Sequence, residues 1–353
     1  MPTQHLYSET PDTATTTRMY QEAASSGDVV ARQLEHNAAR VAEIGAALRA
    51  RPPRTVVTCA RGSSDHAATY GKYLIETRAR VLTVSAAPSV SSVYGVDQDL
   101  RDCLYIAISQ SGRSPDLLTS VTAAKRSGAT VLALCNDPEA PLNGLADHVL
   151  PLCAGPERSV AATKSYIASL AALAHLTAAW TQDAELTAAV QRLPESLNAA
   201  WKLDWSAALE PLVPVSHLYV IGRGLGLGVA QEAALKCKET CGLHAEAFSS
   251  AEVRHGPFAL LGAGFPALLL AQDDATQAGL EALAAELVNR GVQVLLAGAN
   301  VPGTIHLPTI PESAVVAPAL LAASTYRLLA HLATARGHDP DQPPFLHKVT
   351  QTV

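Results

Sequence analysis

Short apolar runs alternate with segments of helical length along most of the chain. Residues 18–50 carry apolar side chains at helical spacing and are predicted to form a helix, and residues 67–76 are predicted to form another. The apolar runs between such segments are predicted to be buried strands: 55–60, 81–86, 103–109, 130–135 and 148–152. Strands that alternate with helices indicate an α/β fold, with a parallel sheet covered on both faces.

The same pattern recurs in the second half of the chain. The corresponding stretches are 104–108 with 267–271 and 126–132 with 289–295, both at an offset of 163 residues, and Arg61-Gly62 reappears as Arg223-Gly224. A constant offset is the signature of an internal repeat. Two copies of one α/β unit are therefore predicted, joined across residues 194–214.

Composition and charge narrow the class of protein. The 353 residues are 48% hydrophobic and 16% charged, which is enough to build two domains with sizeable cores. A formal net charge of -6 argues against nucleic acid as a partner, although a local loop can still bind an anion. No apolar run of about 18 residues occurs and the first residues are polar, so neither a membrane span nor a signal peptide is predicted. The expected location is the cytoplasm.

Two features that could hold a metal or a nucleotide do not fit that role. Cys237 and Cys241 lie four residues apart, which is not a structural zinc spacing, and most of the other cysteines lie in apolar runs. The run 222–228, G-R-G-L-G-L-G, lacks the third glycine of a dinucleotide-binding fingerprint. We therefore expect buried thiols, no metal site and no cofactor.

Hydroxyl groups gather where one strand of the first copy ends. The stretch 109–114, S-Q-S-G-R-S, lies between that strand and a helix expected to begin near Pro115. Hydroxyl and backbone N–H donors at the positive end of a helix dipole form a cradle for phosphate, whereas a plain helix cap needs only one serine. Ser63 and Ser64 follow the preceding strand and should face the same crevice. The second copy has Gln272-Asp273-Asp274 at the corresponding place and should not bind phosphate there.

The most charged stretch of the chain is 231–257. If 229–240 is a helix that ends at Gly242, three charged residues share one of its faces: Glu232, Lys236 and Glu239. The following segment, which has no clear helical or strand period, contains His244, Glu246, Glu252 and His255. On its own this stretch is as consistent with a solvated helix face, with ion pairs between residues four apart, followed by a polar loop as it is with a functional site.

Together these features resemble the sugar isomerase (SIS) family, most closely the isomerase half of glucosamine-6-phosphate synthase and the stand-alone SIS-type glucosamine-6-phosphate deaminases. The resemblance extends from Thr55 to the C-terminus and rests on five motifs: Gly62-Ser63-Ser64, Ser109-Gln110-Ser111-Gly112, Val160-Ala161-Ala162-Thr163-Lys164, the stretch 232–257, and the tail Asp341-Gln342-Pro343 followed by Lys348-Val349-Thr350. It implies two tandem SIS domains, each a flavodoxin-like, doubly wound parallel five-stranded sheet in an α-β-α sandwich. The implied parts are an N-terminal arm and helix (1–50), the first SIS domain with the phosphate loop (51–195), the second with the catalytic helix (208–338) and a tail that closes the active site (339–353).

The resemblance also assigns roles to individual residues. Glu239 corresponds to the proton-shuttling glutamate, supported by Glu232 and Lys236, and Lys348 to the tail lysine near the sugar carbonyl. His255 corresponds to the ring-opening histidine, which the neighbouring subunit of a homodimer contributes. The expected phosphate ligands are Ser63, Ser64, Ser109, Gln110, Ser111 and Ser114, and the residues expected near the sugar are Val160 and Ala162. Ala162 replaces a serine of the synthases and Arg113 replaces a glutamate, so the identity of the sugar stays open.

The expected reaction is conversion of glucosamine 6-phosphate and water to fructose 6-phosphate and ammonia by aldose-ketose isomerisation. One alternative is amination or isomerisation of a related sugar phosphate. Because no glutaminase domain precedes the repeat, the ammonia would then come from solution or from a partner. A second alternative, from another functional class, is a sugar-phosphate sensor without turnover.

Overall fold

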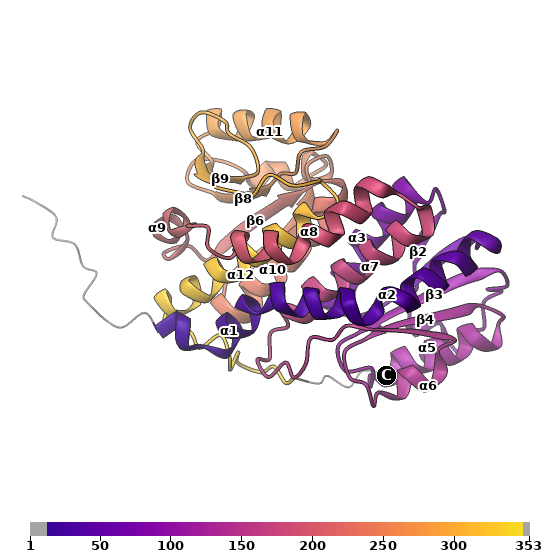
Figure 1. Cartoon of the computed structure of the whole chain (residues 1–353). Helices are drawn as coiled ribbons and strands as arrows, with labels where there is room; N and C mark the ends of the chain where they lie inside the picture. The colour runs from indigo at the N-terminus through magenta and orange to yellow at the C-terminus, as the bar shows by residue number, and fades with distance from the viewer. Residues whose placement is uncertain (1–12, 349–353) are drawn as a thin grey trace, which may run out of the picture.

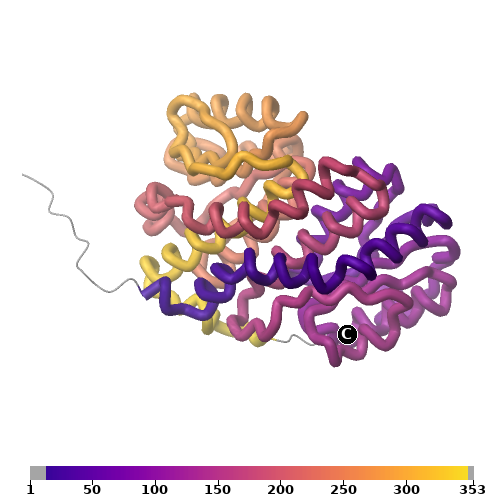
Figure 2. The backbone as a smooth tube through the Cα atoms, in the orientation of Figure 1, coloured from indigo at the N-terminus to yellow at the C-terminus, as the bar shows by residue number. Residues whose placement is uncertain are grey.

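Two parallel five-stranded sheets, one from each half of the chain, form the framework of the protein (Figure 1). Figure 2 shows the path of the backbone through the two halves. The structure is a computed structural model that describes residues 13–348. The first sheet has the order β2-β1-β3-β4-β5 and the second has β7-β6-β8-β9-β10, so corresponding strands occupy corresponding places. This is the flavodoxin-like order, which confirms both the predicted fold class and the predicted duplication.

The strands of the first sheet are β1 (Thr55–Cys59), β2 (Thr83–Ser85), β3 (Cys103–Ser109), β4 (Thr130–Cys135) and β5 (His148–Pro151). Those of the second are β6 (His217–Gly222), β7 (His244–Ser249), β8 (Pro266–Leu270), β9 (Gln293–Ala297) and β10 (Ile305–Leu307). The longer helices are α2 (Ser26–Ala50), α3 (Ser63–Arg78), α5 (Pro115–Arg126), α7 (Lys164–Thr181), α8 (Ala184–Ala200), α10 (Leu227–Cys241), α11 (Gln277–Asn289) and α12 (Ala317–Ala335). The short ones are α1 (Arg18–Ala24), α4 (Ser89–Ser92), α6 (Pro141–Leu145) and α9 (Leu209–Leu212), with 3₁₀ turns at Thr13–Thr16, Ser206–Ala208, Gly224–Gly226, Glu252–Arg254 and Pro257–Leu260.

The predicted strands of the first copy agree with the structure to within two residues at each end, because central parallel strands are buried on both faces. In β3, for example, every residue after Cys103 is buried. The prediction failed for β7, which was expected to have no regular structure. This strand lies at the edge of its sheet and is only partly buried, so its sequence lacks an apolar run.

Two helix boundaries also differ from the prediction. α3 begins at Ser63 rather than at Ala67, so Ser63 and Ser64 form its first turn. The helix predicted over 18–50 is interrupted at Ser25, where the hydroxyl groups of Ser25 and Ser26 donate to the carbonyl groups of Glu22 and Ala23. Residues 1–12 of the predicted N-terminal arm lie outside the described residues. Val349 and Thr350 of the tail motif lie outside them as well.

A central layer of helices lies between the two sheets and belongs to both copies (Figure 1). One large core cluster contains side chains of both sheets, such as Ile106 of β3 and Val220 of β6, together with residues of α2, α3, α7, α8, α10 and α12. Smaller clusters lie beneath α5 in the first copy and α11 in the second. Within residues 13–348, no helix combines the length and apolar character needed to cross a bilayer.

The close approach of α3 and α10 holds the two copies together at one end of this layer. A Cβ atom at Gly228 of α10 would lie 2.5 Å from the carbonyl oxygen of His66 in α3 and 3.1 Å from the amide nitrogen of Tyr70. Only glycine therefore allows the two backbones to lie this close. The predicted helix over 229–240 is confirmed as α10, and Gly242 ends it in the left-handed conformation, with a φ of 61°.

We predict that Gly228→Ala destabilises the fold by about 1–3 kcal/mol, because the added methyl group must push α3 and α10 apart. The matched control is Gly279→Ala in α11, where an added Cβ meets nothing within 4 Å. This control should stabilise the protein by up to about 1 kcal/mol, because alanine favours the helix. Urea unfolding followed by circular dichroism measures both changes, and equal effects at the two positions would contradict this view of the interface.

Candidate active site

The serine-rich loops meet at the switch point of the first sheet. The strand order reverses between β1 and β3, and in α/β sheets the crevice at such a point binds ligands. Cys59 of β1 pairs with Ala107 of β3, so both strands end at the same edge. α3 begins directly after β1 at Ser63, and α5 begins after β3 at Pro115. Two helix N-termini, with N–H groups that have no intrahelical acceptor, therefore flank the crevice.

The loop after β3 has the shape of an anion cradle. The Ser109 hydroxyl accepts a hydrogen bond from the backbone N–H of Gly112 at 2.9 Å, and Gly112 has a φ of 61°. A side chain at Gly112 would also overlap Ala140 and Cys135, so the tight turn requires glycine. Over residues 13–348, four partly buried side chains of the predicted set have no hydrogen-bond partner and can bind a ligand: Ser64, Gln110, Ser111 and Ser114.

An ion pair that the sequence analysis missed joins the two loops of the crevice. Arg61, directly after β1, donates through Nε and Nη2 to one carboxylate oxygen of Asp116 at 2.9 and 2.8 Å. Asp116 lies in the first turn of α5, and its side chain is fully buried. The recurrence of Arg61 as Arg223 was visible in the sequence, but nothing there indicated its partner.

The charged face of α10 is buried against this crevice rather than exposed to solvent. The Lys236 side chain is 0% exposed, and its ammonium group lies 2.5 Å from Glu239, 3.4 Å from Glu232 and 3.0 Å from the Ser63 hydroxyl. Ser63 belongs to α3 of the first copy and the three charged residues to α10 of the second. The interpretation of 231–241 as a solvated helix face is therefore wrong, and three of the predicted catalytic residues meet Ser63 of the predicted phosphate-binding set at the contact between the copies.

Glu232 is the innermost group of this cluster. Tyr326 of α12 donates its hydroxyl to Glu232 Oε1 at 2.9 Å, and His66 Nδ1 of α3 lies 3.0 Å from Glu232 Oε2. Burial alone would raise the pKa of Glu232, but Lys236, His66 and Tyr326 hold the pKa of this carboxyl below its ordinary value. Burial would likewise lower the pKa of Lys236, whereas Glu232 and Glu239 raise it. Both groups are therefore charged at neutral pH.

The C-terminal tail returns to the first copy beside the Val160–Ala162 loop. Lys348 donates to the carbonyl oxygen of Ser159 at 2.7 Å and lies 3.5 Å from the buried carboxylate of Glu157. Glu157 also accepts hydrogen bonds from the backbone N–H groups of Thr163 and Ser165. This carboxylate, which the sequence analysis did not single out, therefore links the tail lysine to the loop that carries Val160 and Ala162.

His255 lies apart from this cluster. It follows the 3₁₀ turn Glu252–Arg254 on an exposed loop of the second copy. No hydrogen bond or ion pair joins its side chain to Glu239 or Lys348 among the described residues. Its contribution across a subunit interface stays a prediction.

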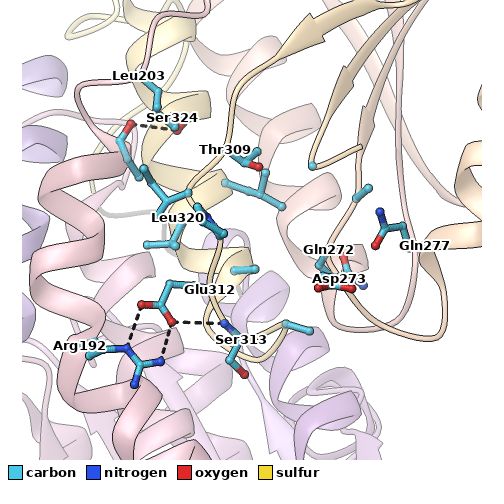
Figure 3. Close-up of a pocket in the computed structure, with 18 residues that line it drawn as sticks. Arg192, Leu203, Gln272, Asp273, Gln277, Thr309, Glu312, Ser313, Leu320 and Ser324 are labelled. Carbon is cyan, nitrogen blue, oxygen red and sulfur yellow. Dashed lines mark hydrogen bonds and ion pairs between the residues drawn. The ribbon is translucent and has the colours of Figure 1, made fainter. Parts of the chain in front are cut away.

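The corresponding crevice of the second copy is occupied by a side chain. The Gln272 amide group donates to Arg223 O at 2.8 Å, Asp274 Oδ2 at 3.0 Å and Thr276 Oγ1 at 3.2 Å. It therefore fills the place that the serine loop leaves open in the first copy. A cavity of about 690 Å³ lies beside it, between the β8 and β9 ends and α8 and α12 (Figure 3). Asp273 lines this cavity, and the Arg192 guanidinium that also lines it already pairs with Glu312 at 2.9 Å, so the cavity is a poor site for phosphate.

Within the described part of the chain, no group of three or more His, Cys, Asp or Glu residues is placed to hold a metal ion. All six cysteines are free thiols, and four of them are buried. Burial raises the pKa of Cys59 and Cys135 to about 11, so these thiols are unreactive at neutral pH.

Comparisons with known proteins identify the family of the chain. The profile of the SIS domain family matches the chain twice, at residues 51–179 and 212–334. A glutamine--fructose-6-phosphate aminotransferase (isomerizing) from Aeropyrum pernix is 35% identical over 314 residues, which are 83% of this chain and 50% of that protein. One from Symbiobacterium thermophilum is 34% identical over 332 residues, 87% of this chain and 53% of that protein. The chain thus spans about half the length of these curated relatives.

Solved structures share the whole fold. A protein from Silicibacter pomeroyi, assigned as a phosphosugar isomerase, has a TM-score of 0.89 and 42% identity, and the match covers 92% of this chain and 100% of that one. The C-terminal domain of glucosamine-fructose-6-phosphate aminotransferase from Francisella tularensis has a TM-score of 0.83 and 25% identity, covering 97% and 100%. With a family profile that matches both copies and a strand order that repeats in both sheets, the chain belongs to the SIS domain family.

Proposed function

We propose that this protein is an aldose-ketose isomerase that releases ammonia from glucosamine 6-phosphate and forms fructose 6-phosphate. The observation that carries the proposal is the contact between Lys236 and both Ser63 and Glu239. This contact links the Glu239 carboxylate, which can transfer protons, to the helix N-terminus that flanks the anion cradle. Glu239 is 20% exposed, so a ligand in the crevice can reach its carboxylate.

The proposed proton transfer needs one base that reaches both C1 and C2 of the open-chain sugar. Glu239 would remove the proton from C2 and return it to C1. In the same isomerisation the amine nitrogen loses a proton and O1 gains one, so that the C1 aldehyde becomes an alcohol and the amine becomes an imine at C2. Water then adds to the imine carbon, the carbon–nitrogen bond breaks, and ammonia leaves a ketone behind. Phosphate bound in the cradle would supply binding energy away from the reacting carbons and hold C1 and C2 against Glu239.

Two further residues complete the proposed site. Lys348, held beside Val160 and Ala162, would place positive charge next to the sugar carbonyl. His255 from the neighbouring subunit of a homodimer would open the ring by moving a proton between O5 and O1. Its exposed position on the second copy is compatible with a role in a partner's site.

The second candidate function is the same chemistry run toward amination of fructose 6-phosphate. The names of the curated relatives favour it, since they are aminotransferases of fructose 6-phosphate. This chain spans about half of their length. The direction of net reaction is a matter of concentrations, because both directions use the same proton transfer.

We predict that purified protein releases ammonia from glucosamine 6-phosphate and that Glu239→Gln lowers kcat by at least about a hundredfold, the range for loss of a general base. A coupled assay for ammonia and fructose 6-phosphate measures the reaction. Release of ammonia by Glu239→Gln at the wild-type rate would contradict the role of Glu239. A shift in melting temperature with the sugar phosphate but no turnover would instead indicate a sensor.

We predict that Ser111→Ala raises KM for the same substrate by about tenfold or more and leaves kcat nearly unchanged, because the cradle binds ground state and transition state alike. The matched control is Ser313→Ala, a hydroxyl in the cavity of the second copy, and it should leave both constants unchanged. The opposite pattern would move the phosphate site to the second copy.

A further inference from the structure

We propose that His66 and Tyr326 are positioning residues that keep Glu232 ionised and, through Lys236, fix the carboxylate of Glu239 in its working position. This inference rests on the proposed function of Glu239. Neither residue belongs to the five motifs on which the resemblance to the family rests. His66 contacts the charged cluster from α3, and Tyr326 contacts it from α12.

Burial of Glu232 removes water from its carboxylate and so disfavours its charged form. Its side chain is 1% exposed, and a carboxylate at that depth is charged only if donors replace water. Both oxygens have one: His66 Nδ1 lies 3.0 Å from Oε2, and the Tyr326 hydroxyl lies 2.9 Å from Oε1. Because Glu232 has only acceptor atoms, the bond to His66 requires a proton on Nδ1. His66 and Tyr326 therefore stabilise the ionised form of Glu232 over the protonated form.

Lys236 connects Glu232 to Glu239, the proposed base. The Lys236 ammonium lies between two carboxylates, at 3.4 Å from Glu232 and 2.5 Å from Glu239. While Glu232 is ionised, the Lys236 ammonium forms ion pairs with both Glu232 and Glu239. A protonated Glu232 would leave Lys236 paired with Glu239 alone, which changes the position of the Glu239 carboxylate. The ionisation of a buried residue thus controls the position of a partly exposed one.

The ionisation of Glu232 depends on the titratable groups that face it. The titratable groups that face Glu232 come from every helix packed against it: His66 of α3, Tyr166 of α7, Tyr326 of α12, and Lys236 and Glu239 of α10 itself. Tyr166 has no hydrogen bond to Glu232, and its buried hydroxyl oxygen has no partner among the described residues. The donors that lie outside α10 and can be removed one at a time are therefore His66 and Tyr326.

The test compares Tyr326→Phe and His66→Leu with two controls. Tyr70→Phe is the matched control for the tyrosine, because Tyr70 is also fully buried but donates to the carbonyl oxygen of Val315 at 2.9 Å rather than to Glu232. His66→Asn is the matched control for the histidine, because the asparagine amide can donate from about the position of Nδ1. Removing a donor raises the pKa of a carboxyl, so the acid limb of kcat should move upward by about one to two pH units in the test variants.

On the acid side of the shifted limb we expect kcat of Tyr326→Phe and His66→Leu to fall by about tenfold or more relative to the wild type, with KM little changed, because neither residue belongs to the phosphate cradle. His66→Asn should restore much of kcat and return the acid limb toward that of the wild type. Tyr70→Phe should lower the melting temperature without moving the acid limb. An acid limb that stays in place in both test variants, or that moves equally in Tyr70→Phe, overturns the proposal.

A second readout needs no turnover, so it separates this inference from the proposed function. The depressed pKa of Glu232 contributes stability above its unfolded pKa, and this stability is lost as pH falls through the folded pKa. In Tyr326→Phe the loss should begin at higher pH than in Tyr70→Phe, as measured by urea unfolding from about pH 3 to pH 8. Identical pH dependence in the two variants contradicts the inference, even if the protein turns out to act on another sugar phosphate.

Discussion

The buried ammonium group of Lys236 is the constraint on which the arrangement of both halves depends. Its side chain is 0% exposed, and an unpaired charge at that depth would cost several kcal/mol. Glu232 and Glu239 of α10 itself offset most of this cost, and Ser63 adds its hydrogen bond only while α3 and α10 stay in contact, which Gly228 makes possible. The same contact therefore fixes how the copies pack and where the Glu239 carboxylate lies. Because buried ion pairs add little net stability compared with apolar packing, we interpret the cluster as selecting one arrangement of the halves.

The two copies keep one strand order and differ at the edge where ligands bind. In the first copy the last residue of β3 and the loop after it carry three serines, and the loop turns at Gly112, so its donors face an open crevice. In the second copy the Gln272 side chain binds the neighbouring loop at Arg223 and closes the same place. The second copy instead contributes α10, with its carboxylates. In the proposed function one copy binds the substrate and the other supplies the base, and the shared helical layer holds the two sets of residues in fixed relative positions.

Much of this arrangement could be predicted from the sequence, because the spacing of apolar residues along the chain indicates which faces of the helices and strands are buried. The central strands and α10 were found from apolar runs and from the helical spacing that ends at Gly242, and the duplication from a constant offset. The edge strand β7 was missed because one of its faces is exposed and its apolar period is weak. The partners of the charged groups could not be predicted either. His66, Tyr326 and Asp116 are far from Glu232 and Arg61 in the sequence, and only the packing of α3, α5 and α12 brings them together.

The central claim is that a carboxylate on the second copy moves a proton on a sugar phosphate held by the first. The most direct measurement is NMR of fructose 6-phosphate and of glucosamine 6-phosphate incubated with the protein in heavy water, which detects solvent deuterium at C1 or C2 whichever direction the net reaction takes. The account predicts that deuterium enters in the presence of the wild-type protein and fails to enter with Glu239→Gln. Binding of both sugars without any exchange would contradict it.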